Sequence, residues 1–219
     1  MPIPVRSILT RTDDLLLDAG RIRWSVAERI RWGNEAMGAI LIRRPSAFAR
    51  RSVHALQAGT YQTLPAGGAL FLDLVRNIGP DGVTPGRPVR RTDRQLLDDA
   101  DPNWHRIKAK AEIKQYTFDD RLPTVFYVYP PAIAGANVEL IDAALPADVA
   151  EDDEAGSFQI GAEYMEPVVN YVAYRANCKD SEFANGQIAG AYYQAFEAAL
   201  GGQSVAQVNA SPNQPTTSV

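Results

Sequence analysis

Cysteine is nearly absent from this chain of 219 residues, since Cys178 is its single copy. One cysteine excludes an internal disulfide bond. Cys178 stands in a predicted helical segment rich in alanine and tyrosine, where cysteine commonly acts as a small hydrophobic side chain. We therefore expect Cys178 to have a structural role rather than a reactive one.

Long apolar runs are also missing, because no run approaches the roughly eighteen consecutive apolar residues of a membrane-spanning helix. The first residues, Met1-Pro2-Ile3-Pro4, lack the charged start and the long apolar stretch of a signal peptide. We therefore expect a soluble protein that is not exported and has no membrane partner.

Signatures of catalysis and of cofactor binding are scarce. His54 has no cysteine at nucleophile spacing, and Gly67-Gly68 lacks the lysine and the following helix of a phosphate-binding loop. The acidic pairs Asp119-Asp120 and Glu163 with Glu166 stand where hairpin turns and helix starts favour acidic residues. We expect no catalytic residue and no cofactor.

The clearest pattern is a pair of consecutive helical segments between Tyr164 and Leu200. Apolar residues in the first segment are spaced by four, three and four positions, which places them on one helical face. The second segment has a stripe of mostly small residues, made of Ala184, Ile188, Ala191, Ala195 and Ala199. Asp180-Ser181 can cap its start and Gly201-Gly202 can end it, so we expect an antiparallel helical hairpin whose small stripe packs on another helix.

Two further helices are expected near the amino terminus. Residues 4–17 have helical apolar spacing, and Ser25-Val26-Ala27-Glu28 is a capping box that starts a second helix before Pro45. Together with the hairpin these segments would make four helices, the number that closes a compact bundle.

The stretch from Arg51 to Ala144 changes to short runs of β-branched and aromatic residues separated by turn clusters. Its clearest predicted strands are Leu70–Asn77, Val89–Thr92, Thr124–Tyr129 and Val138–Ala143. Pro130-Pro131 is expected to force a turn. No helix of crossover length separates the strands, so we expect antiparallel pairing.

These segments predict an α+β fold in which a four-helix bundle from the two chain ends carries an inserted antiparallel β lobe. Residues 1–50 and 151–202 would form the bundle, residues 51–150 the β lobe, and residues 203–219 an extended tail. The tail contains no charged residue, and its large apolar side chains Val205 and Val208 are candidate anchors on a partner.

The net charge of −4 hides an asymmetry, because residues 1–60 carry ten arginines against five acidic residues and the remainder is strongly acidic. Arg43, Arg44, Arg50 and Arg51 flank Pro45 and are candidate contacts with nucleic acid or with an acidic partner, and the alternative is a solvated turn. The acidic majority of the chain argues against DNA binding as its main role.

One polar cluster, Asp98, Asp99, Asp101 and His105, contains ligand types that divalent cations use. Aspartates before proline and tryptophan also make turns and caps, and we favour that interpretation. Asp93 is expected to cap a short helix that runs through Leu97.

Several segments in order resemble the head-to-tail adaptor proteins of short-tailed phages, a group that includes tubular tail protein A. The matching segments are Arg23-Trp24-Ser25, Trp32-Gly33-Asn34-Glu35-Ala36, Gln62-Thr63-Leu64-Pro65, Leu72-Asp73-Leu74-Val75-Arg76-Asn77, Leu97 to His105, Phe118-Asp119, Phe126-Tyr127-Val128-Tyr129-Pro130-Pro131, and Val169 to Ala176 followed by Lys179-Asp180. None of them is a catalytic signature. The resemblance extends from about residue 5 to 201 and does not cover the tail.

The resemblance implies a non-enzymatic virion protein, made in the host cytoplasm, whose copies form a ring of about twelve. That ring would join the portal protein to the tail nozzle protein, and DNA would pass through its channel without specific binding. Two other classes remain open: a small acidic metal-dependent enzyme that uses the cluster from Asp98 to His105, and a monomeric protein-binding module.

Overall fold

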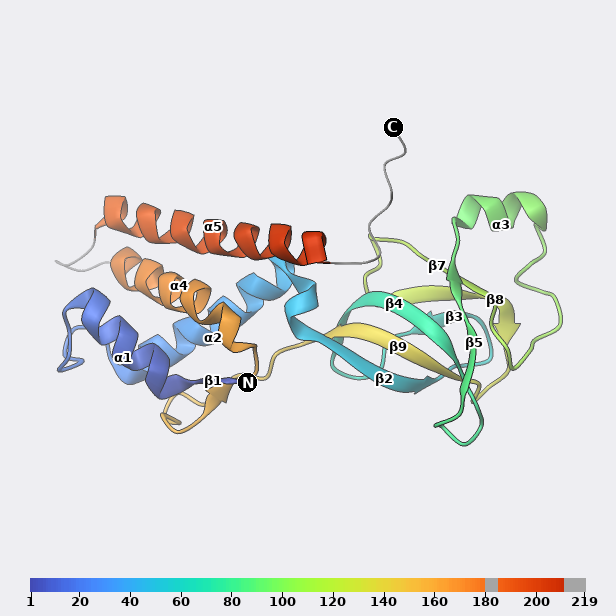
Figure 1. The fold of residues 1–219 in the computed structure, drawn as a ribbon, viewed down its shortest axis with the longest axis horizontal. Helices are drawn as coiled ribbons and strands as arrows, with labels where there is room; N and C mark the ends of the chain where they lie inside the picture. Colours follow the sequence, from blue (N-terminus) through green and yellow to red (C-terminus); the bar gives the residue numbers. More distant parts are fainter. Residues whose placement is uncertain (180–184, 211–219) are drawn as a thin grey trace. The chain divides into compact units, whose positions relative to one another are not determined.

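The structure is a computed structural model that describes residues 1–179 and 185–210, with side chains described as far as Gly202. The chain divides into two compact units (Figure 1). The helical unit comprises Met1–Ala47 and Pro146–Val219, and the β unit comprises Phe48–Leu145.

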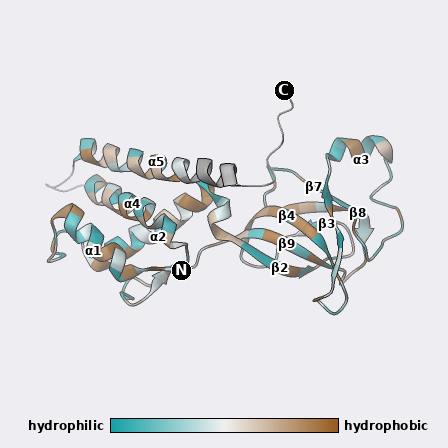
Figure 2. Ribbon diagram, in the orientation of Figure 1, coloured by the Kyte–Doolittle hydropathy of each residue, from teal (hydrophilic) through white to brown (hydrophobic). Residues whose placement is uncertain are grey.

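Two helices begin the helical unit, and each follows from local sequence signals. Helix α1 (Val5–Leu16) buries Val5, Ile8 and Leu9 on one face, and teal and brown residues alternate along its ribbon in Figure 2. Helix α2 (Val26–Arg43) starts at the predicted capping box. The Glu28 amide donates to Ser25 Oγ at 3.3 Å and the Ser25 amide donates to Glu28 Oε2 at 3.0 Å, which confirms that prediction.

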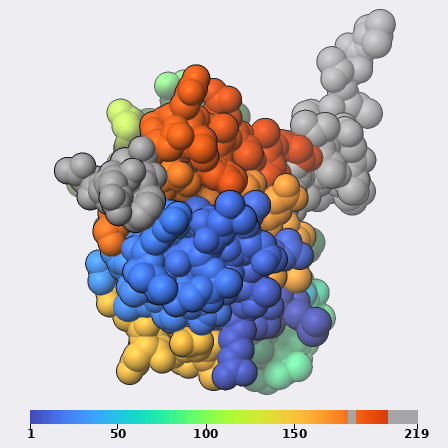
Figure 3. Space-filling model, turned by 90° about the vertical axis from the view of Figure 1, so that its left-hand side faces the viewer, coloured from blue at the N-terminus to red at the C-terminus, as the bar shows by residue number. Residues whose placement is uncertain are grey.

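The helical hairpin is also confirmed, as α4 (Met165–Cys178) and α5 (Gly186–Ala210). Helix α4 packs against α5, α2 and α1, so it is the central helix of this unit. The amino-terminal helices (blue) and α5 (orange-red) are exposed on one face of the unit (Figure 3).

The predicted small stripe of α5 is wrong at the positions that the structure describes, and Ala184 and the predicted cap Asp180-Ser181 lie outside the described residues. Ala191 and Ala195 are exposed, and the buried positions of the described part of α5 are Ala189, Phe196 and Leu200. The Phe196 ring lies 5.3 Å from the Tyr171 ring of α4, centroid to centroid. Aromatic rings bury far more apolar area than methyl groups, so Phe196 packs on α4, whereas Ala191 and Ala195 face outward.

A short two-stranded sheet joins the start of the chain to the segment before α4. In it β1 (Ile3–Pro4) pairs antiparallel with β10 (Ser157–Phe158), and a 3-10 turn at Ala162–Tyr164 leads into α4. Phe158 packs on Gly33 of α2, where a Cβ would lie 2.3 Å from the ring. Only glycine permits that approach.

The β unit consists of two four-stranded sheets. The first sheet has the order β2-β9-β4-β5 and the second has the order β3-β8-β7-β6. The strands of the first sheet are β2 (Ala49–Ala55), β9 (Asn137–Ala144), β4 (Gly68–Ile78) and β5 (Pro85–Pro88). The strands of the second sheet are β3 (Gly59–Thr63), β8 (Val125–Ala132), β7 (Gln115–Phe118) and β6 (Arg90–Arg91). Helix α3 (Arg94–Ala100) follows β6, and Asp93 accepts from the Gln95 amide as its predicted N-cap.

A hydrophobic core separates the two sheets. Strand β9 contributes Val138 and Leu140, and strand β8 contributes Phe126 and Val128. The Phe126 ring stacks on Phe71 of β4 with 4.8 Å between centroids. Because side chains alternate along a strand, the residues between these core positions point to the outer faces of the two sheets.

The predicted four-helix bundle with a β insertion is wrong. The described residues form five α-helices and ten strands in three sheets, within an α+β fold in which helices are a minority. Helix α5 packs mainly on α4 and does not close a four-helix core. The interpretation also missed short strands such as β2 and β3, whose polar and apolar residues are mixed.

Three further predictions fail for local reasons. Strand β8 continues through Pro130-Pro131 instead of turning, and β6 is shorter than predicted and pairs parallel with β7. Helix α5 continues through Gly201-Gly202 to Ala210, so the extended tail does not begin at residue 203. Glycine costs about 1 kcal/mol in a helix but does not forbid one. The rest of the predicted tail, residues 211–219, lies outside the described residues.

Candidate functional site

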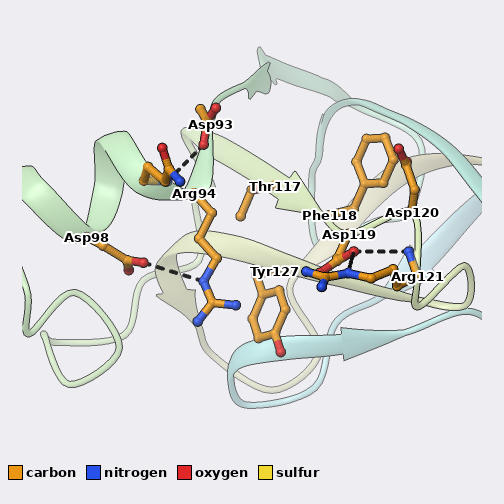
Figure 4. Close-up of a pocket in the computed structure, with 10 residues that line it drawn as sticks. Asp93, Arg94, Asp98, Thr117, Phe118, Asp119, Asp120, Arg121 and Tyr127 are labelled. Carbon is orange, nitrogen blue, oxygen red and sulfur yellow. Dashed lines mark hydrogen bonds and ion pairs between the residues drawn. The ribbon is translucent and has the colours of Figure 1, made fainter.

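An open groove lies on the outer face of the second sheet of the β unit, beside α3 (Figure 4). Its volume is about 610 Å³. We call it the acidic groove, and its lining residues come from α3, β7, β8 and the turn after β7. They are Asp93, Arg94, Gln95, Asp98, Thr117, Phe118, Asp119, Asp120, Arg121 and Tyr127.

Ion pairs fix several of the charges in this groove. Arg121 donates from Nη2 to Asp119 Oδ2 at 2.7 Å and from Nε to Asp119 Oδ1 at 2.9 Å. The Arg121 side chain, then its backbone amide, lowers the pKa of Asp119 to about 2, so this carboxylate stays ionised. Arg94 reaches from α3 to within 3.5 Å of Asp98, and its guanidinium lies 5.8 Å from the centre of the Tyr127 ring.

The groove keeps a negative excess, because four aspartates face two arginines. Asp93 serves as the cap of α3, and neither Asp93 nor Asp120 takes part in an ion pair among the described residues. A wide, charged surface with an aromatic floor suits recognition of a cationic partner surface.

The predicted cluster from Asp98 to His105 forms a folded polar turn. Trp104 is fully buried, and its Nε1 donates to Asp98 Oδ1 at 2.8 Å. The His105 ring stacks on Trp104 at 3.7 Å, and its Nδ1 is hydrogen-bonded to Thr60 Oγ1 at 2.8 Å. Asp101 accepts from the Asn103 amide, as a turn residue does. Within the described part of the chain, no group of three or more histidine, cysteine, aspartate and glutamate residues could hold a metal ion.

The candidate contacts Arg43 and Arg44 lie at the end of α2, in the helical unit. Arg43 donates from Nε to Glu197 at 2.6 Å and from Nη2 to the Tyr193 hydroxyl at 2.6 Å. Its guanidinium also lies 5.5 Å from the centre of the Phe196 ring. Arg43 therefore ties α2 to α5, and Arg44 is buried.

The candidate contacts Arg50 and Arg51 lie on β2, where the neighbouring strand β9 supplies carboxylates. Arg50 donates to both oxygens of the buried Asp142, at 3.0 Å from Nε and 2.9 Å from Nη2. Arg51 pairs with the buried Glu139, although 63% of the Arg51 side chain is exposed. Sequence reasoning missed both carboxylates, because strand pairing brings them to arginines about ninety residues away. Contact of these arginines with a partner stays a prediction.

Three other residues singled out from the sequence lie in the helical unit, namely Cys178, Val205 and Val208. Cys178 is exposed at the end of α4, so a role as a packed hydrophobic side chain is wrong for it. Val205 and Val208 lie in α5, in the part of the helix where the structure describes the backbone but not the side chains. Among the described residues, no helix has the length and apolar character needed to cross a lipid bilayer.

Comparison with known families identifies one match. The family model described as SU10 adaptor protein matches residues 3–216, which is nearly the whole chain. A search of curated proteins found no match.

Proposed function

The chain belongs to the SU10 adaptor protein family, which gives it a structural role in a phage virion, and we propose that its copies form a ring between the portal and the tail nozzle. The observation that carries the proposal is the family match over residues 3–216, which runs through both units. The resemblance to head-to-tail adaptor proteins implies a ring of about twelve copies.

In this proposal DNA passes through the centre of the ring without specific binding. The net charge of −4 supports a channel wall that does not hold the phosphate backbone. Arg43 and Arg50 form ion pairs with carboxylates of the same chain, so these two arginines do not present an uncompensated basic surface to DNA.

Sedimentation with portal particles tests the proposal. We expect the purified protein to pellet with portal particles and to appear as a ring on them in cryo-electron micrographs. The matched control is the same protein sedimented without portal particles, which should stay in the supernatant. A protein that stays in the supernatant with portal particles present would contradict the proposal.

The proposed role is not enzymatic, and ligand-linked stability tests that part separately. A protein with a resident divalent cation would gain melting temperature when the cation is added, because binding to the folded state stabilises it. We expect the same melting temperature with Mg²⁺, Mn²⁺, Zn²⁺ or a chelator. A gain in the wild type that disappears in the double variant Asp98→Asn with His105→Ala would instead favour the metal-dependent enzyme.

A further inference from the structure

A recess on the outer face of the first sheet of the β unit contains two arginines that share one buried carboxylate. Arg76 on β4 donates from Nε to Glu139 Oε2 at 2.5 Å, and Arg51 on β2 pairs through Nε with Glu139 Oε1. We call this site the arginine recess, and its volume is about 310 Å³. The remaining lining residues are Ser52, Val53, Ile78, Gly82 and Val83.

The arginine recess has one positive charge in excess, because two guanidinium groups face one carboxylate. Both ion pairs use the Nε atom, so the Nη groups of Arg51 and Arg76 keep donors for a further acceptor. Two apolar side chains flank these donors, and Val83 is 79% exposed and Val53 is 51% exposed. Guanidinium donors beside exposed apolar side chains are typical of a protein-binding surface rather than of a solvated turn.

The arginine recess and the acidic groove lie on opposite faces of the β unit. Glu139 stands between the core residues Val138 and Leu140, so it points away from the core on the first sheet. Tyr127 stands between the core residues Phe126 and Val128, so it points away from the core on the second sheet. The β unit therefore has an excess of positive charge in the recess on one outer face and an excess of negative charge in the groove on the other.

We propose that the arginine recess of one copy binds the acidic groove of the next copy. The proposal rests on the ring of the proposed function and names the surfaces that would join its subunits. Charge complementarity selects this partner, because the recess requires carboxylates and the opposite face of the same unit presents Asp120 and Asp93, which form no ion pair with any described residue. Contacts between two different faces are head-to-tail, and such contacts close into a ring when the rotation from one copy to the next divides a full turn.

Two charge reversals test the contact from its two sides. Arg51→Glu makes the recess repel the groove, and Asp120→Lys makes the groove repel the recess. In an assembly of either variant alone, two like charges face each other at every contact. We therefore expect the self-association constant to fall about tenfold or more, as measured by sedimentation velocity. Asp120 is exposed on a turn far from the buried Glu139, so Asp120→Lys tests the contact even if Arg51→Glu impairs folding.

An equimolar mixture of the two variants gives the sharper result. In an alternating assembly the glutamate that replaces Arg51 in one variant meets the lysine that replaces Asp120 in the other. At the next contact the unchanged arginine of the second variant meets the unchanged aspartate of the first. Every contact is then matched, so we expect the mixture to recover wild-type association within about threefold.

Arg87→Glu and Glu112→Lys are the matched controls, since these residues form an exposed ion pair of the same unit outside both sites. They change charge by the same amounts and should leave association unchanged. Single variants that associate as the wild type does, or a mixture as weak as its components, would overturn the proposal. Wild-type protein that does not self-associate in solution or on portal particles would overturn it too.

The same measurements keep this inference separate from the proposed function. If wild type and both variants pellet equally with portal particles and form equal rings, the named surfaces are wrong and the adaptor role stands. If the wild type does not pellet with portal particles, the proposed function fails whatever the reversals do to self-association.

Discussion

The helical unit and the β unit both contain buried carboxylates paired with arginine, but the arginine is buried in the helical unit and partly exposed in the β unit. In the helical unit the cation is inside, because Arg29 of α2 is fully buried. Its five N–H groups have five acceptors: the Trp24 carbonyl, Thr12 Oγ1, Asp13 Oδ1, the Asp18 carbonyl and Asp18 Oδ2. The loop between α1 and α2 is folded around this guanidinium.

In the β unit the carboxylate is inside. Asp142 is fully buried and Glu139 is 6% exposed, whereas their partners Arg50 and Arg51 keep 37% and 63% of their side chains exposed. The guanidinium of each arginine contacts the buried carboxylate from the surface side, so part of the arginine side chain stays in solvent.

The exposure of the arginine distinguishes an ion pair that only stabilises its own unit from one whose arginine can also contact a partner protein. A buried guanidinium with every donor satisfied can only hold its own unit together. A buried carboxylate under exposed arginines leaves guanidinium donors at the surface. Removing Arg29 leaves the buried Asp18 without its cation while Asp13 keeps Arg21, whereas Arg50 can be solvated if it loses Asp142.

Replacement of Arg29 by methionine should have the largest effect. We expect Arg29→Met to lower the free energy of unfolding by about 3–5 kcal/mol, because the buried Asp18 loses its cation, although Asp13 keeps Arg21. Urea denaturation followed by circular dichroism measures the change. Arg31→Met is the control, since Arg31 forms an exposed pair with Glu151 and its replacement should leave the denaturation midpoint nearly in place. Equal losses in the two variants would contradict the comparison.

A smaller loss is expected from Asp142→Asn in the β unit. The side chain keeps its shape but loses its charge, and Arg50 can turn partly into solvent, so we expect a loss of about 1–3 kcal/mol in the same assay. Asp119→Asn is the control for an exposed pair with arginine and should leave the denaturation midpoint in place. A loss from Asp142→Asn as large as that from Arg29→Met would show that burial of the arginine does not matter.

Acid conditions sharpen the comparison through Asp18. Burial raises the pKa of this carboxyl, but hydrogen bonds from the Trp24, Ile22 and Arg23 amides and the charge of Arg29 outweigh it, so the pKa lies below the usual 3.8. A lowered folded-state pKa gives stability that is present above pH 3.8 and is lost as the pH falls through the folded value.

The stability difference between wild type and Asp18→Asn should therefore be largest near neutral pH and should shrink as the pH falls below 3.8. Urea denaturation at a series of pH values measures it. A difference of constant size from neutral to acidic pH would contradict a role for the ionised carboxylate.

The smallest effect is expected from Ala191→Leu on α5. Ala191 is exposed, so the added side chain meets solvent and the free energy of unfolding should change by no more than about 0.5 kcal/mol. Ala189→Leu is the matched control on the same helix, because Ala189 is buried and overpacking should cost about 1–3 kcal/mol. The opposite order would place the small stripe against α4 after all.

Sequence patterns predicted elements best where the signal is local. The capping box at Ser25 and the cap at Asp93 are confirmed, because a cap is a hydrogen bond between residues two or three positions apart. The apolar strand interior around Phe126 is also confirmed. Strand β2 was missed, because its alternating exposure depends on a core contributed by strands far along the chain.

The acidic groove could be predicted only in part. Asp98 and Asp119 stand out in the sequence as acidic residues, but the sequence gives no sign of their arginine partners Arg94 and Arg121. Residues from α3, β7 and β8 meet there because the second sheet pairs β7 with β8 and places α3 beside them. The spacing of residues along the sequence does not reveal a contact that strand pairing creates.

The sequence by itself determined where helices such as α2 and α3 begin, that a hairpin of helices follows residue 164, and that the chain resembles phage adaptor proteins. The tertiary structure alone decided which face of α5 is buried and which arginine is buried together with its carboxylate. Caps and apolar periodicity are properties of a few neighbouring residues. Burial depends instead on the surface that another segment offers, and that surface exists only after the chain has folded.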